Sequence, residues 1–342
     1  CKGSKRVDIV VLFPDNMLHL RYINQHVMIT FSICLAALIA GYFIYGRFIE
    51  RLFKPDNRQT PALTQTDGVD FIPLPTWKIF MIQFLNIAGL GPIFGAIMGA
   101  KFGTSSYLWI VLGSIFAGAT HDYLAGMLSI RHNGESLPEI RGRYLGVTTK
   151  QVMRGFTVIL MILVGAVFVA GPAGLLAKLT PDNLDTTFWI IVVFLYYILA
   201  TLLPIDKIIG KIYPLFAIAL LFMAVGILFM LYYHHPVLPE FWDGLSNTHP
   251  QSESLPIFPI MFVSIACGAI SGFHATQSPL MARCMKSEMF GRPVFYGAMI
   301  TEGIVALVWA AVSSYLFYDN GVANEANISL QAPAVVSKIS RE

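Results

Sequence analysis

The chain has 342 residues, of which 56% are hydrophobic and only 13% charged, and its net charge is +3. A soluble domain carries roughly 25% charged residues, so this composition excludes an ordinary soluble protein and indicates a multi-pass membrane protein. No basic stretch interleaved with aromatic residues points to nucleic acid. The four cysteines form no Cys-x-x-Cys pair. We therefore expect no disulfide framework, no metal and no cofactor.

Residues 1–27 precede the apolar part of the chain. They are polar and lack the apolar core of a signal peptide, whereas Met28 opens a clean apolar stretch and is a candidate start. We expect residues 1–27 to be a non-native or disordered extension, and the alternative is that Cys1 is the mature terminus of a lipoprotein. Residues 28–317 are predicted to form a transmembrane domain, followed by a polar C-terminal segment, 318–342.

Eight apolar stretches are candidate membrane spans, because about 20 apolar residues are needed to cross a bilayer as a helix. They are residues 28–46, 79–100, 107–130, 155–179, 187–203, 212–233, 257–282 and 294–317. The fifth stretch is the shortest, and its ends are the least sharply marked. The sequence thus predicts an all-α polytopic membrane protein with about eight transmembrane helices.

The basic residues of the predicted loops set the orientation. From Met28 onward, fifteen Lys and Arg residues fall on one side of the predicted spans and four on the other. Cytoplasmic loops carry an excess of Lys and Arg, so the richer side is predicted to be cytoplasmic. The first span then begins outside and ends inside. The loop 234–256 contains neither Lys nor Arg and is predicted to be external.

The second span contains a cluster of helix-breaking residues, Gly89, Gly91 and Pro92. Proline lacks a backbone N–H and clashes with the preceding turn, while glycine permits unusual dihedral angles. Gly91, Gly95 and Gly99 also form a stripe of small residues, which lets another helix approach closely. From this segment alone, helix packing and a binding site are equal alternatives.

The seventh span is also predicted to be interrupted, by Gly268, Gly272 and Pro279. It lies five helices after the second span and runs in the opposite direction. Transporters built from inverted repeats place two such broken helices together near the bilayer midplane, where free N–H groups bind anions and freed carbonyls bind cations. We therefore expect part of a five-plus-five inverted-repeat fold of the LeuT type. This expectation rests on topology and helix breaks, since the two halves share no convincing identity.

Polar side chains accompany both predicted breaks. Gln83 and Asn86 precede the first, and each either binds substrate or bridges two helices. Thr276, Gln277 and Ser278 follow the second and indicate a polar cavity, because polar groups at membrane depth need partners. The candidate substrate-binding or ion-binding residues are Gln83, Asn86, Gly89, Gly91, Pro92, His274, Thr276, Gln277 and Ser278.

Two acidic side chains and two histidines lie within the predicted spans. Glu302 is eight residues into the last span, about 12 Å deep, and is predicted either to carry a proton or bind substrate, or else to bond a neighbouring helix. His274 is a second proton-coupling candidate; it either binds substrate, shares a proton with Glu302 or caps the broken helix. His121 and Asp122, toward the cytoplasmic end of the third span, form either an inner gate or a proton exit, or else a local hydrogen-bonded pair.

Four motifs of the chain resemble the carbon starvation protein A family, and the last is the most specific. They are Ile87-Ala-Gly-Leu-Gly-Pro-Ile93, Ala117-Gly-Ala-Thr-His-Asp-Tyr123, Asn133-Gly-Glu-Ser-Leu-Pro-Glu139 and Ile265-Ala-Cys-Gly-Ala-Ile-Ser-Gly-Phe-His-Ala275. The likeness covers about residues 28–317. It implies a transporter of the bacterial inner membrane built on the five-plus-five inverted repeat. Members of that family continue past the end of this chain, so we expect a truncated member with an incomplete second repeat.

The expected function is secondary active uptake of small carbon compounds during carbon starvation, which the resemblance implies to be peptides. Pyruvate–proton symport is the alternative, and an ion channel is less favoured because channels do not need two broken helices. No nucleophile–base set and no His-Glu-x-x-His motif is present, so we expect no enzyme. The expected partners are a peptide or small carboxylate, a coupling proton or cation and the lipid bilayer; the oligomeric state stays open.

Overall fold

The computed structural model describes residues 28–181, 183–201 and 205–318, and every regular element in these ranges is a helix. The predicted terminal segments, 1–27 and most of 318–342, lie outside the described residues. Five helices are long and apolar enough to cross a membrane, or up to seven if each of two bent pairs is one span. The prediction of an all-α membrane protein is therefore confirmed, with five to seven candidate spans.

The unbroken candidate spans follow the predicted order. They are α2 with α3 (Ile29–Phe43, Tyr45–Phe53), α7 with η2 and α8 (Ser105–Leu112, Gly113–Gly118, Ala119–Arg131), α10 (Val147–Leu179), α12 (Ile205–His234), and η5 with η6 and α16 (Glu288–Phe290, Arg292–Tyr296, Gly297–Tyr318). The predicted fifth span corresponds to α11 (Thr186–Thr201), which has 16 residues. This helix is shorter than the roughly 20 residues that a perpendicular span requires.

The first bent pair consists of α5 (Thr76–Ile87) and α6 (Leu90–Gly99), whose directions differ by 46°. The helix is interrupted at 88–89, where Ala88 and Gly89 leave the helical conformation. Pro92 then lies in the first turn of α6, where its missing N–H removes no helical hydrogen bond. The predicted break of the second span is therefore present, and it lies just before Pro92.

The second bent pair joins η4 and α13 (Ile257–Met261, Phe262–Ser264) to α14 (Ala266–Ala269) and α15 (His274–Ala282), and its bend of 72° lies between Ser264 and Ala266. The chain leaves the helix at 270–273, where Ser271 adopts a φ of 48°. Gly272 lies in this break, but Gly268 lies inside α14 and Pro279 inside α15. Gly268 and Pro279 were therefore wrongly expected to interrupt the span. Proline is tolerated inside membrane helices because neighbouring groups satisfy the freed carbonyl.

The two bent pairs pack directly on each other through the predicted stripe of small residues. A Cβ atom on Gly95 would lie 2.5 Å from the backbone oxygen of Ser264, and Cβ atoms on Gly91 and Gly99 would overlap Cys267 and Ile265. The close-packing interpretation of the stripe is therefore correct. The stripe holds the two bent pairs together, because the helix that the first pair packs against belongs to the second pair.

Gly95→Val should destabilise the protein, because the Ser264 carbonyl that it meets belongs to the backbone and cannot swing aside. We expect a lower melting temperature in detergent, corresponding to a loss of about 1–3 kcal/mol typical of overpacking. Gly155→Val on α10 is the matched control, since a Cβ there meets nothing within 4 Å. Equal melting temperatures for the two variants would contradict this account of the helix contact.

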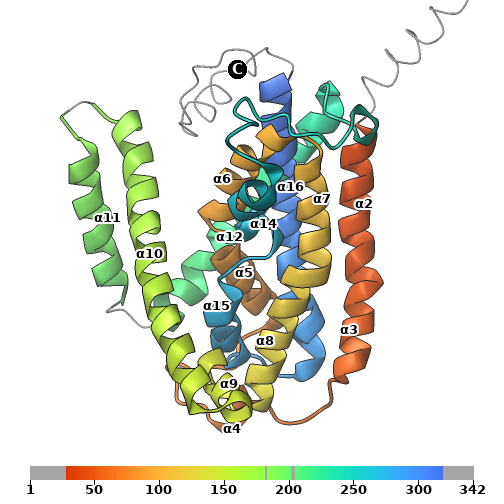
Figure 1. The fold of residues 1–342 in the computed structure, drawn as a ribbon. Helices are drawn as coiled ribbons and strands as arrows, with labels where there is room; N and C mark the ends of the chain where they lie inside the picture. The colour runs from red at the N-terminus through yellow and green to blue at the C-terminus, as the bar shows by residue number, and fades with distance from the viewer. Residues whose placement is uncertain (1–27, 182, 202–204, 319–342) are drawn as a thin grey trace, which may run out of the picture.

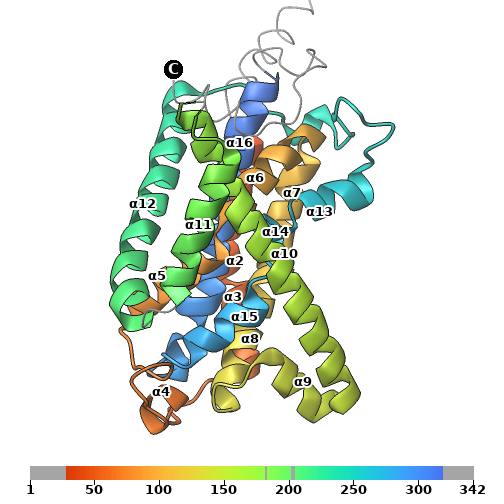
Figure 2. The same cartoon turned by 90° about the vertical axis from the view of Figure 1, so that its left-hand side faces the viewer.

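The central helix is α16. In the most apolar 18-residue stretch of its span, 89% of the residues are buried, whereas in that of α10 only 6% are buried. Figure 1 shows α10 and α11 beside the main bundle, on the side away from α2 and α3. Figure 2 shows α12 along another edge, and α13 near the end opposite α9. The exposed apolar side chains of α10 and α11 suit contact with lipid, because no hydrophobic effect penalises them there.

The ends of several spans are tied together by an ion-pair cluster around Glu288. The buried Glu288 carboxylate lies 3.0 Å from Arg131 at the end of α8 and 3.3 Å from Arg58. Arg131 also donates to the Lys54 carbonyl at 2.8 Å and lies over the Phe53 ring at 4.0 Å. This cluster joins α3, α8 and η5 on the side predicted to be cytoplasmic.

The opposite end of the bundle is closed by Glu240, from the loop predicted to be external. Its carboxylate accepts hydrogen bonds from the backbone N–H groups of Ile29 at 3.0 Å and Thr30 at 2.7 Å. The first N–H groups of a helix have no partner within the helix, so Glu240 caps α2 and complements its dipole. The loop is thereby fixed over the start of the first span.

A cysteine at Ser246 should react with a membrane-impermeant thiol reagent in intact cells. Ser246 is exposed in the loop between α12 and η4, which the distribution of basic residues places outside. Leu145→Cys is the control: Leu145 is 65% exposed at the end of α9 (Leu137–Leu145), on the predicted cytoplasmic side, and should react only after the cells are permeabilised. The reverse pattern of labelling would invert the predicted orientation.

Candidate functional site

A buried hydrogen-bonded cluster joins α5, α8 and α15. The Gln83 side-chain amide donates to Asp122 Oδ1 at 2.9 Å and to Ser278 Oγ at 3.3 Å. The Ser278 hydroxyl donates to the same Asp122 oxygen at 2.5 Å. Asn86, one turn beyond Gln83, donates to the Gln277 side chain at 3.2 Å. Both broken helices thus contribute polar side chains to one cluster, which the third span completes.

His274 is the first residue of α15 and lies between Asp122 and His121. Its Nδ1 is 3.4 Å from Nδ1 of His121, and its Nε2 is 3.8 Å from Asp122 Oδ2. Asp122 and His274 are fully buried, whereas His121 is partly exposed. Among the described residues, the polar partners of His274 are therefore His121 and Asp122, and not Glu302 as one of the alternatives supposed.

Several polar atoms of this cluster have no hydrogen-bond partner among the described residues. They are Gln83 Oε1, Asp122 Oδ2 and His274 Nε2. Buried polar atoms are nearly always satisfied in folded proteins, so a group of unsatisfied atoms indicates a functional site. The arrangement leaves one carboxylate oxygen and one ring nitrogen facing each other without a bond.

Glu302 lies on α16 against the second break. It is fully buried, its Oε1 is 3.9 Å from Cys267 Sγ, and its Oε2 has no hydrogen-bond partner in the described part of the chain. Asp122, which is also fully buried, lies on α8, and α8 contacts α16. Beside it, the Ser114 hydroxyl donates to the Gly268 carbonyl at 3.3 Å. Two buried carboxyl groups therefore flank the broken seventh span.

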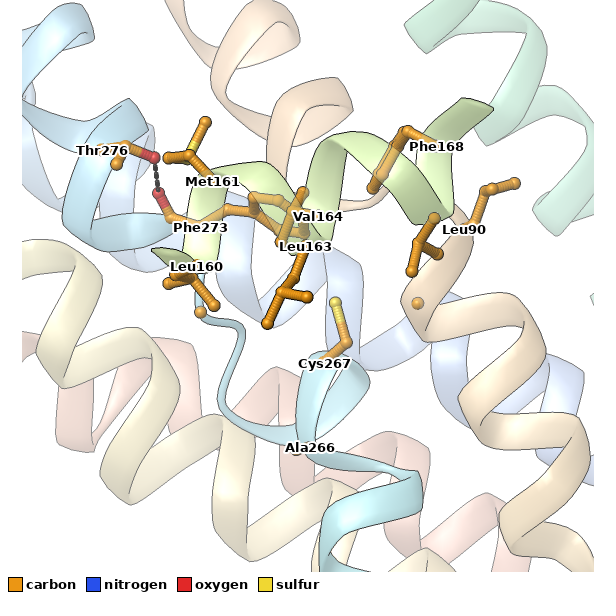
Figure 3. A pocket seen from close by; sticks show the side chains of 13 residues that line it. Leu90, Leu160, Met161, Leu163, Val164, Phe168, Ala266, Cys267, Phe273 and Thr276 are labelled. Atoms are coloured by element: carbon orange, nitrogen blue, oxygen red, sulfur yellow. Dashed lines mark hydrogen bonds between the residues drawn. The ribbon is translucent and has the colours of Figure 1, made fainter. Parts of the chain in front are cut away.

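A cavity of about 340 Å³ lies between α10 and the two breaks. Leu90 and Gly91 border it from α6, Cys267 from α14, and Gly272 and Phe273 from the second break. Figure 3 shows Cys267 pointing from α14 toward Leu163 and Val164 of α10, with Phe168 and Leu90 on one side and Thr276 on the other. The walls are almost entirely apolar.

The N-termini of α6 and α15 both border this cavity. Neither helix has a side-chain hydrogen bond at its N-cap, and each has at least nine residues. The first N–H groups of a helix are free of helical partners and carry partial positive charge. Two such termini at one apolar cavity can bind an anionic group such as a carboxylate.

A second cavity, of about 420 Å³, continues toward the predicted cytoplasmic side between α10 and α15. Thr276 borders both cavities, and Arg154 and Arg283 line the second. Arg154 hydrogen-bonds Glu139, which lowers the pKa of that carboxyl and keeps it ionised. Arg283 lies 3.5 Å from Asp70. The two cavities follow each other along the same pair of helices.

The structure brings most of the predicted site residues together, in two places. Gln83, His274, Ser278, His121 and Asp122 share one cluster, with the Asn86–Gln277 pair beside it, while Gly91 and Thr276 border the 340 Å³ cavity. Gly89 faces Phe168, and Pro92 packs on Gly268. The roles proposed for these residues stay predictions.

Two features of the site differ from the sequence interpretation. His121 and Asp122 bond residues of other helices, not each other, so the alternative of a local pair is wrong. The α10 wall of the cavity, including Phe168, was not identified, because an apolar helix gives no sign of which face lines a cavity. Cys267 was also missed as a site residue, although it lies within the most specific motif.

Comparison with known proteins shows which family the chain is similar to. The family described as "Carbon starvation protein CstA" matches residues 24–182 and 178–340. An "Uncharacterized membrane protein" of Haemophilus influenzae is 45% identical over 88% of this chain and 94% of its own length. The "Peptide transporter CstA" of Campylobacter jejuni is 29% identical over 82% of this chain and 49% of its own length.

The "Pyruvate/proton symporter BtsT" of Escherichia coli is 26% identical over 81% of this chain and 48% of its own length. The chain thus spans about half the length of these two transporters. No solved structure matches the chain. The family match covers nearly all of the described residues, including both broken helices and the polar cluster. Together with the apolar helices, it shows that this multi-pass membrane protein belongs to the carbon starvation protein CstA family.

Proposed function

We propose that the chain takes part in secondary active uptake of peptides and that the substrate occupies the cavity between α10 and the two helix breaks. The observation that carries this proposal is the position of the α6 and α15 N-termini at one apolar cavity. They would hold the carboxylate of the substrate, while the apolar walls receive its side chains. The name of the Campylobacter jejuni relative supports the same substrate class.

Pyruvate is the second candidate substrate, and the Escherichia coli relative favours it. Both substrates present a carboxylate, so the helix termini suit either. The size and lining of the cavity favour the peptide: its volume of about 340 Å³ falls within the roughly 300–1,000 Å³ of small-molecule sites. A pyruvate molecule would leave much of the apolar wall uncovered, whereas a peptide with apolar side chains would contact it.

We further propose that uptake is coupled to protons through the buried acid Glu302. Glu302 contacts Cys267, and Cys267 borders the cavity, so a change in its charge would be felt at the substrate. The contact between the two broken spans supports, as a proposal, an arrangement of the LeuT type with the first helix of each repeat broken. Residues 28–317 would form this transmembrane domain, placed in the bacterial inner membrane.

Uptake by the purified chain in proteoliposomes tests the proposal. Labelled dialanine and labelled pyruvate are offered separately, with and without an inward proton gradient. We expect saturable uptake of the dipeptide that the gradient accelerates and an uncoupler abolishes. Saturable uptake of neither substrate would contradict the transport function, and a steady single-channel current would favour an ion channel instead.

A further inference from the structure

We propose that His121, His274 and Asp122 form a proton relay that loads and unloads Asp122, and that Asp122 is a second coupling acid beside Glu302. This inference rests on the proposed proton-coupled transport and names the route by which protons reach the buried site. For His121 and Asp122 it favours the proton-exit alternative over an inner gate and adds His274 as the group between them.

The His274 ring faces a different proton partner with each of its nitrogens. Nδ1 lies 3.4 Å from Nδ1 of His121, and Nε2 lies 3.8 Å from Oδ2 of Asp122. An imidazole can accept a proton at one nitrogen and release one from the other, so a ring in this position connects its two neighbours. The nitrogen and the oxygen that face each other are also atoms without a hydrogen-bond partner in the described ranges.

The carboxyl group of Asp122 is held so that one oxygen stays available. Gln83 and Ser278 both donate to Oδ1, at 2.9 and 2.5 Å, and neither bonds Oδ2. Oδ2 is therefore the oxygen that faces the His274 ring. The outer end of the chain of three side chains is also the less buried one: His121 is partly exposed, while His274 and Asp122 are fully buried. The three side chains thus connect a partly exposed group to a buried acid.

The charges around Asp122 allow it to change its protonation state. Its hydrogen-bond and ion-pair partners, among the described residues, are Gln83, Ser278 and His274, and none of them carries a permanent charge. Glu288 is the opposite case: it is buried as well, but Arg131 and Arg58 hold it as a carboxylate. Asp122 can therefore gain or lose a proton without breaking an ion pair with a basic residue.

Other charged groups act on the relay from the helices packed around it. They are the buried carboxyl of Glu302 on α16 and the guanidinium of Arg141 on α9, and both helices pack on α8. Two buried carboxylates repel each other in a low-dielectric interior, so a charge on one acid disfavours a charge on the other. Loading Asp122 therefore affects the protonation of Glu302, which contacts the cavity wall.

One transfer conserves protons and charge as follows. A proton on Nδ1 of His121 moves to Nδ1 of His274, while the proton on Nε2 of His274 moves to Oδ2 of the Asp122 carboxylate. His274 is neutral before and after and has changed its tautomer. Asp122 has become a neutral carboxylic acid, and His121, which starts as an imidazolium, has become neutral. A hydronium ion at its exposed side protonates His121 again and leaves water.

The relay is linked to the substrate site through α15. His274 is the first residue of this helix, and its neighbours Gly272, Phe273 and Thr276 border the 340 Å³ cavity. Gln83 and Ser278 belong to the two broken spans, so the hydrogen bonds of Asp122 join both spans to α8. Protonation of Asp122 would change these bonds and thereby the relative stability of the arrangements of the broken helices.

Infrared difference spectroscopy between acidic and neutral pH tests the relay without requiring transport. The purified chain in lipid vesicles should show the C=O stretch of a protonated carboxyl group at acidic pH. Asp122→Asn should remove this component, and it should persist in Glu302→Gln. After a pH jump, His274→Gln and His121→Gln should retain the component but form it on the order of 100-fold more slowly, a typical contribution of a positioned proton-transfer group.

Transport gives the second readout. Asp122→Asn should lose gradient-driven uptake but retain exchange of labelled for unlabelled dipeptide, which needs no net proton movement. His132→Gln is the matched histidine control, because His132 bonds the exposed Tyr144 and lies outside the relay. It should match the wild type in both assays. Loss of exchange together with uptake in Asp122→Asn would indicate a structural role and overturn the coupling assignment.

The outcomes separate the relay from the proposed function. A carboxyl component that is unchanged in Asp122→Asn, or one that forms at the wild-type rate in His274→Gln, overturns the relay whatever the transport assays show. If the wild-type chain shows the carboxyl component and Asp122→Asn lacks it, but the wild type transports neither substrate, only the transport function is contradicted. If Asp122→Asn fails to fold, the rate measured in His274→Gln still decides.

Discussion

Gly272→Leu should abolish dipeptide uptake, whereas Gly165→Leu should leave it intact. A Cβ at either position meets nothing within 4 Å, so both positions have room for the start of a side chain. Gly272 borders the 340 Å³ cavity, while Gly165 on α10 is exposed and does not border it. A leucine at 272 would fill space next to the α15 N-terminus, where we place the substrate carboxylate.

The expected loss for Gly272→Leu is on the order of 100-fold in uptake, since a displacement of about 1 Å in a positioned group is enough for such an effect. Direct binding of labelled dialanine should fall with it. Gly165→Leu should melt at an equal or higher temperature, because leucine is favoured over glycine inside a helix by up to about 1 kcal/mol. Wild-type uptake by Gly272→Leu would place the substrate elsewhere.

Hydrophobic length predicted the helices of this fold well, because crossing a bilayer imposes one length on every span. Each of the eight predicted stretches corresponds to a helix or a bent pair in the structure, although α11 is shorter than a full span. Helix breaks were less predictable. Gly89 and Gly272 lie in breaks, but Pro279 lies inside α15, because the cost of a proline depends on neighbouring groups that the local sequence does not reveal.

The sequence indicated which residues belong to the site, but not which of them form hydrogen bonds with each other. An acid, a histidine or a glutamine at membrane depth is costly, so Gln83, Asp122 and His274 could be identified from position alone. Their pairing could not, because Ser278 and Asp122 are 156 positions apart and meet only when the rotation of both helices is known. The same limit applies to the cavity, whose α10 wall consists of ordinary apolar side chains.

Glu302→Gln should uncouple uptake from the proton gradient. The side chain keeps its size and stays polar, so the contact of α16 with Cys267 is preserved while the carried proton is lost. We expect gradient-driven accumulation of dialanine to fall on the order of 100-fold, as for loss of an essential acid–base group. Exchange of labelled for unlabelled dipeptide should continue, because the cavity and both helix termini are unchanged.

The control for this variant is Glu240→Gln, which also replaces a buried carboxyl group but at the end of the bundle, where it caps α2. It should lower the melting temperature by weakening the cap, a loss of about 1 kcal/mol, and leave the dependence on the gradient unchanged. If Glu302→Gln retains the full dependence while Asp122→Asn loses it, the relay acid alone carries the coupling proton. If both variants retain it, neither buried acid carries the coupling proton, and another group of the protein must do so.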